Sequence, residues 1–202
     1  MSTEDPRFAG VARLYGDEGL QRLSQAHVAV VGIGGVGSWV AEALARSGVG
    51  KITLFDLDDV CVSNTNRQAH ALEGQVGRAK VDVMAERLRA INPACKVHAV
   101  ADFVTRDTMV EYITEHLDCV IDCIDSVMAK PALIAWCRRR NIAVVTTARS
   151  GGQINPTPVQ PVAPIKTLNR PLSSRVIPTT QTANQYYRNV YMLYYAPLCL
   201  SH

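Results

Sequence analysis

Acidic side chains are missing from the last third of the chain, because all 18 Asp and Glu residues lie at or before Asp125. From Ser126 onward the charged residues are all basic, so the net charge of +3 conceals an acidic first part and a strongly basic end. A basic end is typical of a nucleic-acid partner, and equally of a segment that was not selected as a folded surface.

The chain also lacks C-x-x-C pairs and long apolar runs. Its six cysteines are scattered, which argues against a zinc site and favours reduced thiols. No apolar run approaches the ~18 residues of a membrane span, and the acidic start of the chain does not resemble a signal peptide. We therefore expect a cytoplasmic protein without a membrane span.

Glycines follow an apolar, β-branched run at 28–31, and a helical pattern follows them at 38–46. Gly32, Gly34 and Gly37 fit the pattern G-x-G-x-x-G. The first glycine allows a sharp turn, the second lets a phosphate approach the backbone, and the third lets helix and strand pack closely. The pattern predicts a buried strand, a tight turn and a helix whose N-terminus binds an anion.

A second predicted strand ends in Asp56, about 20 residues after the glycines, where folds of this kind bind a ribose hydroxyl. The two features together indicate a bound nucleotide. The glycines alone leave NAD, FAD and ATP open, and they also leave open a structural turn that binds no nucleotide.

Strand and helix patterns alternate along most of the chain, which predicts an α/β fold: a Rossmann-like, doubly wound, mainly parallel sheet with helices on both faces. We expect an N-terminal arm and helix at 1–26, with residues 1–10 disordered, and a nucleotide-binding domain at 27–160. Segment 161–202 is rich in Pro and Tyr and has no sustained period, so we expect an irregular, divergent or truncated tail. The expected helices are 38–46, 80–91, 107–116 and one ending near 140; the expected strands are 28–31, 51–56, 96–100, 119–125 and 142–147.

Asn64, Arg67 and Lys80 lie in or just after a long polar connection, and Asp125 ends a later strand. A unit charge pair at ~4 Å contributes roughly 4 kcal/mol at an effective dielectric of ~20, so cations and a metal-binding acid matter to a triphosphate and are superfluous for a dinucleotide. The alternatives are a solvated loop residue for Arg67, a helix-surface charge for Lys80 and a helix N-cap for Asp125.

Five motifs together resemble the ubiquitin-activating-enzyme-like adenylyltransferases, the superfamily of ThiF, MoeB and HesA. They are the segments 32–38, 54–58, 63–68, 77–80 and 122–126. Segments 13–16, 91–93 and 150–157 are similar to the tRNA threonylcarbamoyladenosine dehydratase branch of that superfamily. The resemblance covers about three quarters of the chain.

The resemblance implies an ATP- and Mg²⁺-dependent enzyme that adenylates the threonyl carboxylate of threonylcarbamoyladenosine in tRNA and then closes a ring with net loss of water. It also implies a homodimer, and cysteine-desulfurase or sulfur-acceptor proteins as further partners. By the same resemblance, Gly34 and Gly35 face the phosphates, Asp56 holds the ribose and Asp125 binds Mg²⁺. The remaining implied site residues are Asp58 near the nucleotide, Asn64, Arg67 and Lys80 on the triphosphate, and Arg13, which reaches the ATP of a neighbouring subunit.

Two other functions remain open at this point. Arg149 stands where the family has a small residue, and the likeness fades in the tail, so the chain could be a non-catalytic ATP- or tRNA-binding remnant. An NAD(P)-dependent oxidoreductase is the third alternative, and Arg67, Lys80 and Asp125 count against it. The run Arg138–Arg140 fits a tRNA contact and equally the ordinary preference for cations at a helix C-terminus.

Overall fold

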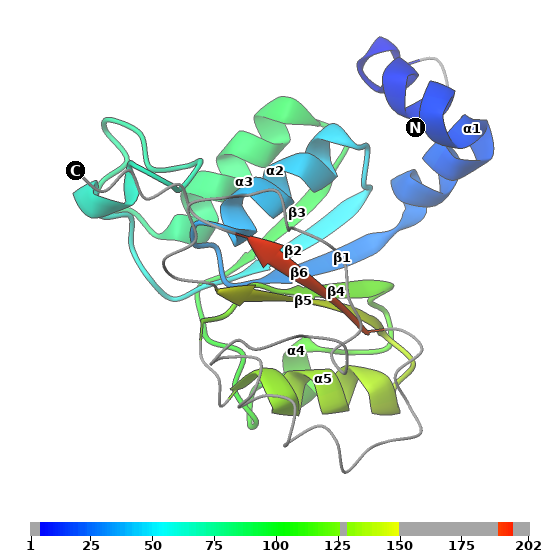
Figure 1. Cartoon of the computed structure of the whole chain (residues 1–202). Helices are drawn as coiled ribbons and strands as arrows, with labels where there is room; N and C mark the ends of the chain where they lie inside the picture. The colour runs from blue at the N-terminus through cyan, green and yellow to red at the C-terminus, as the bar shows by residue number, and fades with distance from the viewer. Residues whose placement is uncertain (1–4, 126–128, 150–189, 196–202) are drawn as a thin grey trace.

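Six parallel strands form one sheet in the order β3-β2-β1-β4-β5-β6 (Figure 1). The structure is a computed structural model, and it describes residues 5–125, 129–149 and 190–195. This strand order is that of the Rossmann fold, in which ligands bind beyond the carboxyl ends of the strands. The α/β class predicted from the sequence is confirmed. The strands are β1 (His27–Val31), β2 (Lys51–Phe55), β3 (Lys96–Val100), β4 (Cys119–Asp122), β5 (Ala143–Arg149) and β6 (Val190–Tyr195).

Helices cover both faces of the sheet (Figure 1). Side chains of β1 alternate between the two faces: Val28 and Val30 join the core under α2 and α3, whereas Ala29 and Val31 join the core under α4 and α5. The continuous apolar run is thus explained by burial on both sides. The helices are η1 (Pro6–Phe8), α1 (Ala9–Gln25), α2 (Gly37–Arg46), η2 (Val62–Asn64), α3 (Lys80–Ile91), α4 (Met109–Tyr112) and α5 (Ala129–Arg139).

Three expectations about local structure were wrong. Residues 6–10 are helical rather than disordered, since Asp5 accepts a hydrogen bond from the Arg7 amide and Phe8 is buried. Helix α4 has only four residues, because the chain leaves helical geometry at Ile113, whose carbonyl accepts from the Trp136 indole instead. In the irregular tail, residues 190–195 form β6, a parallel partner of β5. The rest of the tail and segment 150–157, which resembles the dehydratase branch, lie outside the described residues.

Helix α1 projects from the sheet (Figure 1), and most of its residues are exposed. It bends at Gly16, whose φ is +74°, and Leu20 is its one buried residue. Leu14 and Tyr15 stay largely exposed. Within the described residues no helix is long and apolar enough to cross a membrane.

One arginine of the basic run 138–140, at the end of α5, contacts an aromatic ring of the same helix. The Arg140 guanidinium lies 3.4 Å from the centroid of the Trp136 ring, a cation–π contact. Trp136 in turn donates its indole N–H to the Ile113 carbonyl, which ties α5 to α4. The Arg140 side chain therefore has a structural role that requires no tRNA.

We expect stability to fall between neutral and mildly acidic pH because of His70. This imidazole is fully buried and has no hydrogen-bond partner among the described residues, and burial, followed by the charges of Lys80 and Arg87, lowers its pKa to about 4. The unfolded chain binds the proton near pH 6.5, so the free energy of unfolding falls, by up to about 3 kcal/mol, as pH drops from about 6.5 to 4. Urea unfolding at several pH values between about 6.5 and 4 measures this change in the free energy of unfolding. His70→Leu should remove that part of the slope, and an unchanged slope would contradict the assignment.

Candidate nucleotide-binding site

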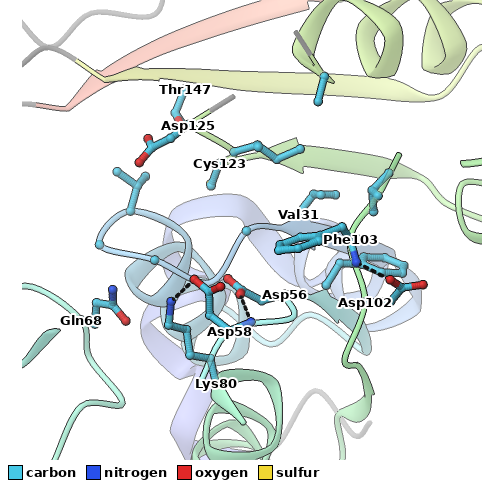
Figure 2. A pocket seen from close by; sticks show the side chains of 18 of the residues that line it. Val31, Asp56, Asp58, Gln68, Lys80, Asp102, Phe103, Cys123, Asp125 and Thr147 are labelled. Carbon is cyan, nitrogen blue, oxygen red and sulfur yellow. Dashed lines mark hydrogen bonds and ion pairs between the residues drawn. The ribbon is translucent and has the colours of Figure 1, made fainter. Parts of the chain in front are cut away.

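A cavity of about 710 Å³ opens at the carboxyl ends of β1 to β4 (Figure 2). This is the ligand position of a Rossmann-type sheet, and the volume lies within the usual range of small-molecule sites. Figure 2 shows Asp58 and Lys80 paired on one side and Asp125 with Thr147 on the other. The predicted site residues that line the cavity are Gly32, Gly34, Gly35, Asp56, Asp58, Asn64, Arg67, Lys80 and Asp125; Gly37 and Arg13 do not line it.

The three glycines of the pattern have different surroundings. Gly32 has φ +90°, and a Cβ there would lie 3.0 Å from the Cys123 carbonyl oxygen, so only glycine suits this turn. A Cβ on Gly34 would meet nothing within 4 Å, which leaves the backbone open to a phosphate from the cavity side. Gly37 has a packing role instead, because its Cβ would lie 1.8 Å from the Gly32 carbonyl oxygen.

Asp56 connects the end of β2 to the glycine turn. Its Oδ2 accepts the Ile33 backbone N–H at 2.6 Å, and its Oδ1 accepts the Asp58 N–H at 2.9 Å. Each carboxylate oxygen retains a further lone pair, so the buried carboxylate can also accept from a ribose hydroxyl in the cavity. The geometry therefore fits both a structural role and the role that the sequence suggests.

Lys80 enters the cavity from the first turn of α3. Its Nζ lies 2.7 Å from Asp58 Oδ2, and its side chain is only 7% exposed, against 60% for Asp58. A lysine on an open helix surface would be solvated, so the alternative of a helix-surface charge is wrong. The exposed carboxylate can move aside when a stronger anion reaches the ammonium group.

The long connection after β2 is fastened to the start of α2 by two residues that sequence reasoning missed. The Trp39 indole donates to the Arg67 carbonyl at 2.9 Å, and Ser38 Oγ accepts the Ala69 N–H at 3.2 Å. Their signal in the sequence was their position directly after the third glycine. These two hydrogen bonds hold the connection close to the glycine turn that precedes α2.

Within that connection, the side chains of Arg67 and Asn64 both form hydrogen bonds to neighbouring residues of the chain. The Arg67 guanidinium donates to the Ser63 carbonyl and to Asn66 Oδ1, and the aliphatic part of its side chain passes 3.3 Å from the position of a Cβ on Gly35. Asn64 Oδ1 accepts the Cys61 N–H, which closes η2. Arg67 thus reaches the glycine turn as a cation in a fixed place.

Asp125 follows β4 and lines the cavity with an exposed side chain. Residues 126–128 lie outside the described residues, so the N-cap alternative for Asp125 stays a prediction to be tested. Mg²⁺ is commonly held by one or two protein carboxylates together with substrate phosphates and water. A single carboxylate across the cavity from Lys80 and Arg67 fits that pattern.

Two further groups at the site were not found from the sequence. Phe103, half-exposed on the loop after β3, lines the cavity, and Thr108 Oγ1 donates to its carbonyl. Cys123 also lines the cavity, but burial, followed by the Asp122 charge, raises the pKa of its thiol to about 12. The thiol is therefore protonated at neutral pH and unsuited to act as a nucleophile.

A family model described as the ThiF family matches residues 8–191. The chain belongs to the ThiF family. It is 58% identical over 170 residues to tRNA threonylcarbamoyladenosine dehydratase of Escherichia coli K12, an alignment that covers 84% of this chain and 63% of that relative. It is 36% identical over 146 residues to molybdopterin-synthase adenylyltransferase of Salmonella typhimurium, covering 71% of this chain and 58% of that one.

Two solved structures are similar to this chain in fold. The E. coli tRNA N6-threonylcarbamoyladenosine dehydratase TcdA in complex with ATP superposes with a TM-score of 0.89 at 49% identity, over 97% of this chain and 84% of that chain. The E. coli protein MccB with ATP superposes with a TM-score of 0.60 at 25% identity, over 71% of this chain and 45% of that chain. Against its curated ThiF relatives, the chain spans just under two thirds of their length.

Proposed function

We propose that this protein binds ATP and uses it to dehydrate threonylcarbamoyladenosine in tRNA to its cyclic form. The observation that carries the proposal is convergence: nine of the eleven predicted site residues, drawn from separate segments of the chain, line one cavity. The identity to dehydratases of the ThiF family supports this substrate over others in the family.

The proposed chemistry proceeds in two steps. A carboxylate oxygen of the threonyl group attacks the α-phosphorus of ATP and pyrophosphate leaves. The carbamoyl group of the same substrate then attacks the activated carbonyl carbon, loses a proton and expels AMP, which keeps the oxygen. The net change in the nucleoside is the loss of one water molecule.

The charges of the cavity suit that chemistry. Both reactants in the first step are anionic, so fixed cations lower the barrier by offsetting their repulsion. Arg67 and Lys80 lie where they can contact a triphosphate whose phosphates approach Gly34 and Gly35. A bound Mg²⁺ would be held by Asp125 and would neutralise further phosphate charge. This cationic set is the reason to prefer ATP over a dinucleotide and an adenylating enzyme over an NAD(P) oxidoreductase.

The proposed assembly is a homodimer in which Arg13 serves the neighbouring subunit. Arg13 lies on α1, exposed and outside the cavity of its own chain, and α1 leaves Leu14 and Tyr15 uncovered. A second copy that packs on α1 would bury these residues and bring Arg13 to the nucleotide-binding cavity of that copy.

Cysteine-desulfurase or sulfur-acceptor proteins remain proposed partners by family resemblance alone. We propose a cytoplasmic location, as expected for an enzyme that acts on tRNA.

The proposal is tested with the full chain, ATP, Mg²⁺ and tRNA that carries threonylcarbamoyladenosine. Nucleoside mass spectrometry should show loss of one water from the modified base, with one AMP and one pyrophosphate formed per event. ATP binding by calorimetry without product would support the second candidate, a non-catalytic ATP-binding form. Binding of NAD in place of ATP would overturn both.

Asp125→Asn separates metal binding from helix capping. Since Asn is a poor Mg²⁺ ligand, we expect ATP to bind this variant equally with and without Mg²⁺, whereas Mg²⁺ should tighten ATP binding to the unchanged protein. As a cap, Asn would be nearly equivalent to Asp. Calorimetric titrations of both proteins with ATP, with and without Mg²⁺, measure the two affinities. A urea-unfolding curve of Asp125→Asn is the control for folding. Mg²⁺ dependence equal to that of the unchanged protein would refute the metal role.

A further inference from the structure

Three polar side chains are buried together behind the cavity wall, and none of them lines the cavity. Asp122 ends β4, Lys130 lies in the first turn of α5, and Thr146 lies on β5; all are at most 3% exposed. Lys130 Nζ lies 3.0 Å from Asp122 Oδ2 and 3.3 Å from Thr146 Oγ1. Thr146 Oγ1 donates to the same Asp122 oxygen at 2.6 Å.

This network determines the course of the chain towards Asp125. The other carboxylate oxygen of Asp122, Oδ1, accepts the Ile124 backbone N–H at 3.0 Å, a turn directly after the strand. The Asp122 carbonyl accepts the Thr147 hydroxyl at 3.2 Å. Asp122 thus fixes Ile124, the residue before Asp125, while Lys130 and Thr146 fix Asp122.

Stability of the core alone does not call for such a network. Desolvation of a buried ion pair offsets most of its attraction, and an apolar replacement of similar volume is often as stable or more so. Directional hydrogen bonds, in contrast, hold neighbouring groups in one geometry. Partners that orient a metal ligand from behind typically change metal affinity or activity by about 10–100-fold when they are removed.

We propose that the Asp122–Lys130–Thr146 network is a positioning device that presents the Asp125 carboxylate to the metal ion of the bound nucleotide. Lys130 and Thr146 act through Asp122 and the Ile124 amide and touch neither the nucleotide nor the metal. The inference rests on the proposed function, because it assigns a metal to Asp125.

Thr146 is the residue to change, because Lys130→Met would leave a buried carboxylate unpaired and threaten folding. Thr146→Val keeps the shape and the ion pair but removes the hydroxyl donor. With the full chain, calorimetry of ATP binding in the presence of Mn²⁺ should show about tenfold weaker affinity, while metal-free ATP binding stays unchanged. Thr146→Ser should restore the affinity, because it returns the hydroxyl.

Thr53→Val is the matched control. It removes a hydroxyl that bonds to His27 Nε2 in the same sheet, away from the cavity, and should leave both affinities unchanged. The second readout is hydrogen exchange of the Ile124 amide, which should become faster in Thr146→Val and not in Thr53→Val. Unchanged Mn²⁺–ATP affinity with unchanged Ile124 exchange in Thr146→Val, or an equal loss in Thr53→Val, overturns the inference. If the unchanged protein binds no ATP, the proposed function fails, and the amide exchange still decides whether the network holds the turn.

Discussion

Arg67→Ala should weaken ATP binding or turnover by about 10²–10³-fold, the effect of removing one preorganised charge from a reacting anion. The arginine is already held in place: it donates to the Ser63 carbonyl and to Asn66, its own carbonyl accepts from the Trp39 indole, and its side chain passes beside Gly35. A cation fixed in this way gives its full electrostatic contribution without first being ordered by the ligand. Calorimetry with ATP and steady-state turnover on modified tRNA measure the loss.

Arg78→Ala is the matched control for that experiment. Arg78 lies in the same connection, is exposed and pairs with Glu86, and it does not line the cavity. Its removal lowers the positive charge of the protein by the same amount, so equal losses in the two variants would mean that Arg67 acts only through net charge. Arg67→Lys should recover part of the affinity, because it restores the charge but not the planar fork of donors. Unchanged ATP affinity in Arg67→Ala would remove Arg67 from the site.

Much of the fold, and the meeting of most predicted site residues at one cavity, could be predicted because short-range patterns determine them. The apolar run of β1 is buried on both faces, the glycines have the backbone and packing roles that their spacing indicates, and Asp56 lies beside the turn. Parallel strands bring their carboxyl ends to one edge of the sheet, so Asp56 and Asp125, far apart in the sequence, were expected on one cavity.

The remaining features depend on contacts that no local pattern contains. The buried Lys130 looked like any helix lysine, since its partner Asp122 belongs to a different element and Thr146 to a third. Helix α4 ended early because Trp136, on another helix, takes the Ile113 carbonyl. Strand β6 has little period of its own and forms beside β5. Tertiary pairing overrides local preference at each of these places.

Two glycine substitutions in the same turn, at Gly37 and Gly34, should separate folding from nucleotide binding. Gly37→Ala places a Cβ 1.8 Å from the Gly32 carbonyl oxygen, a backbone atom that cannot turn away, so α2 must move off β1. We expect the free energy of unfolding to fall by about 3 kcal/mol or more, the upper end of the range for overpacking.

Gly34→Ala should weaken ATP binding and leave the stability of the fold nearly unchanged. Its Cβ meets no atom within 4 Å and the residue does not have a positive φ, so the free energy of unfolding should stay nearly unchanged. The methyl group would instead occupy space on the cavity side, where the backbone has to approach a phosphate, and ATP affinity should fall. Urea unfolding and ATP calorimetry on both variants provide the comparison. Normal stability in Gly37→Ala would contradict the packing role, and normal ATP affinity in Gly34→Ala would mean that the phosphates do not lie against this turn.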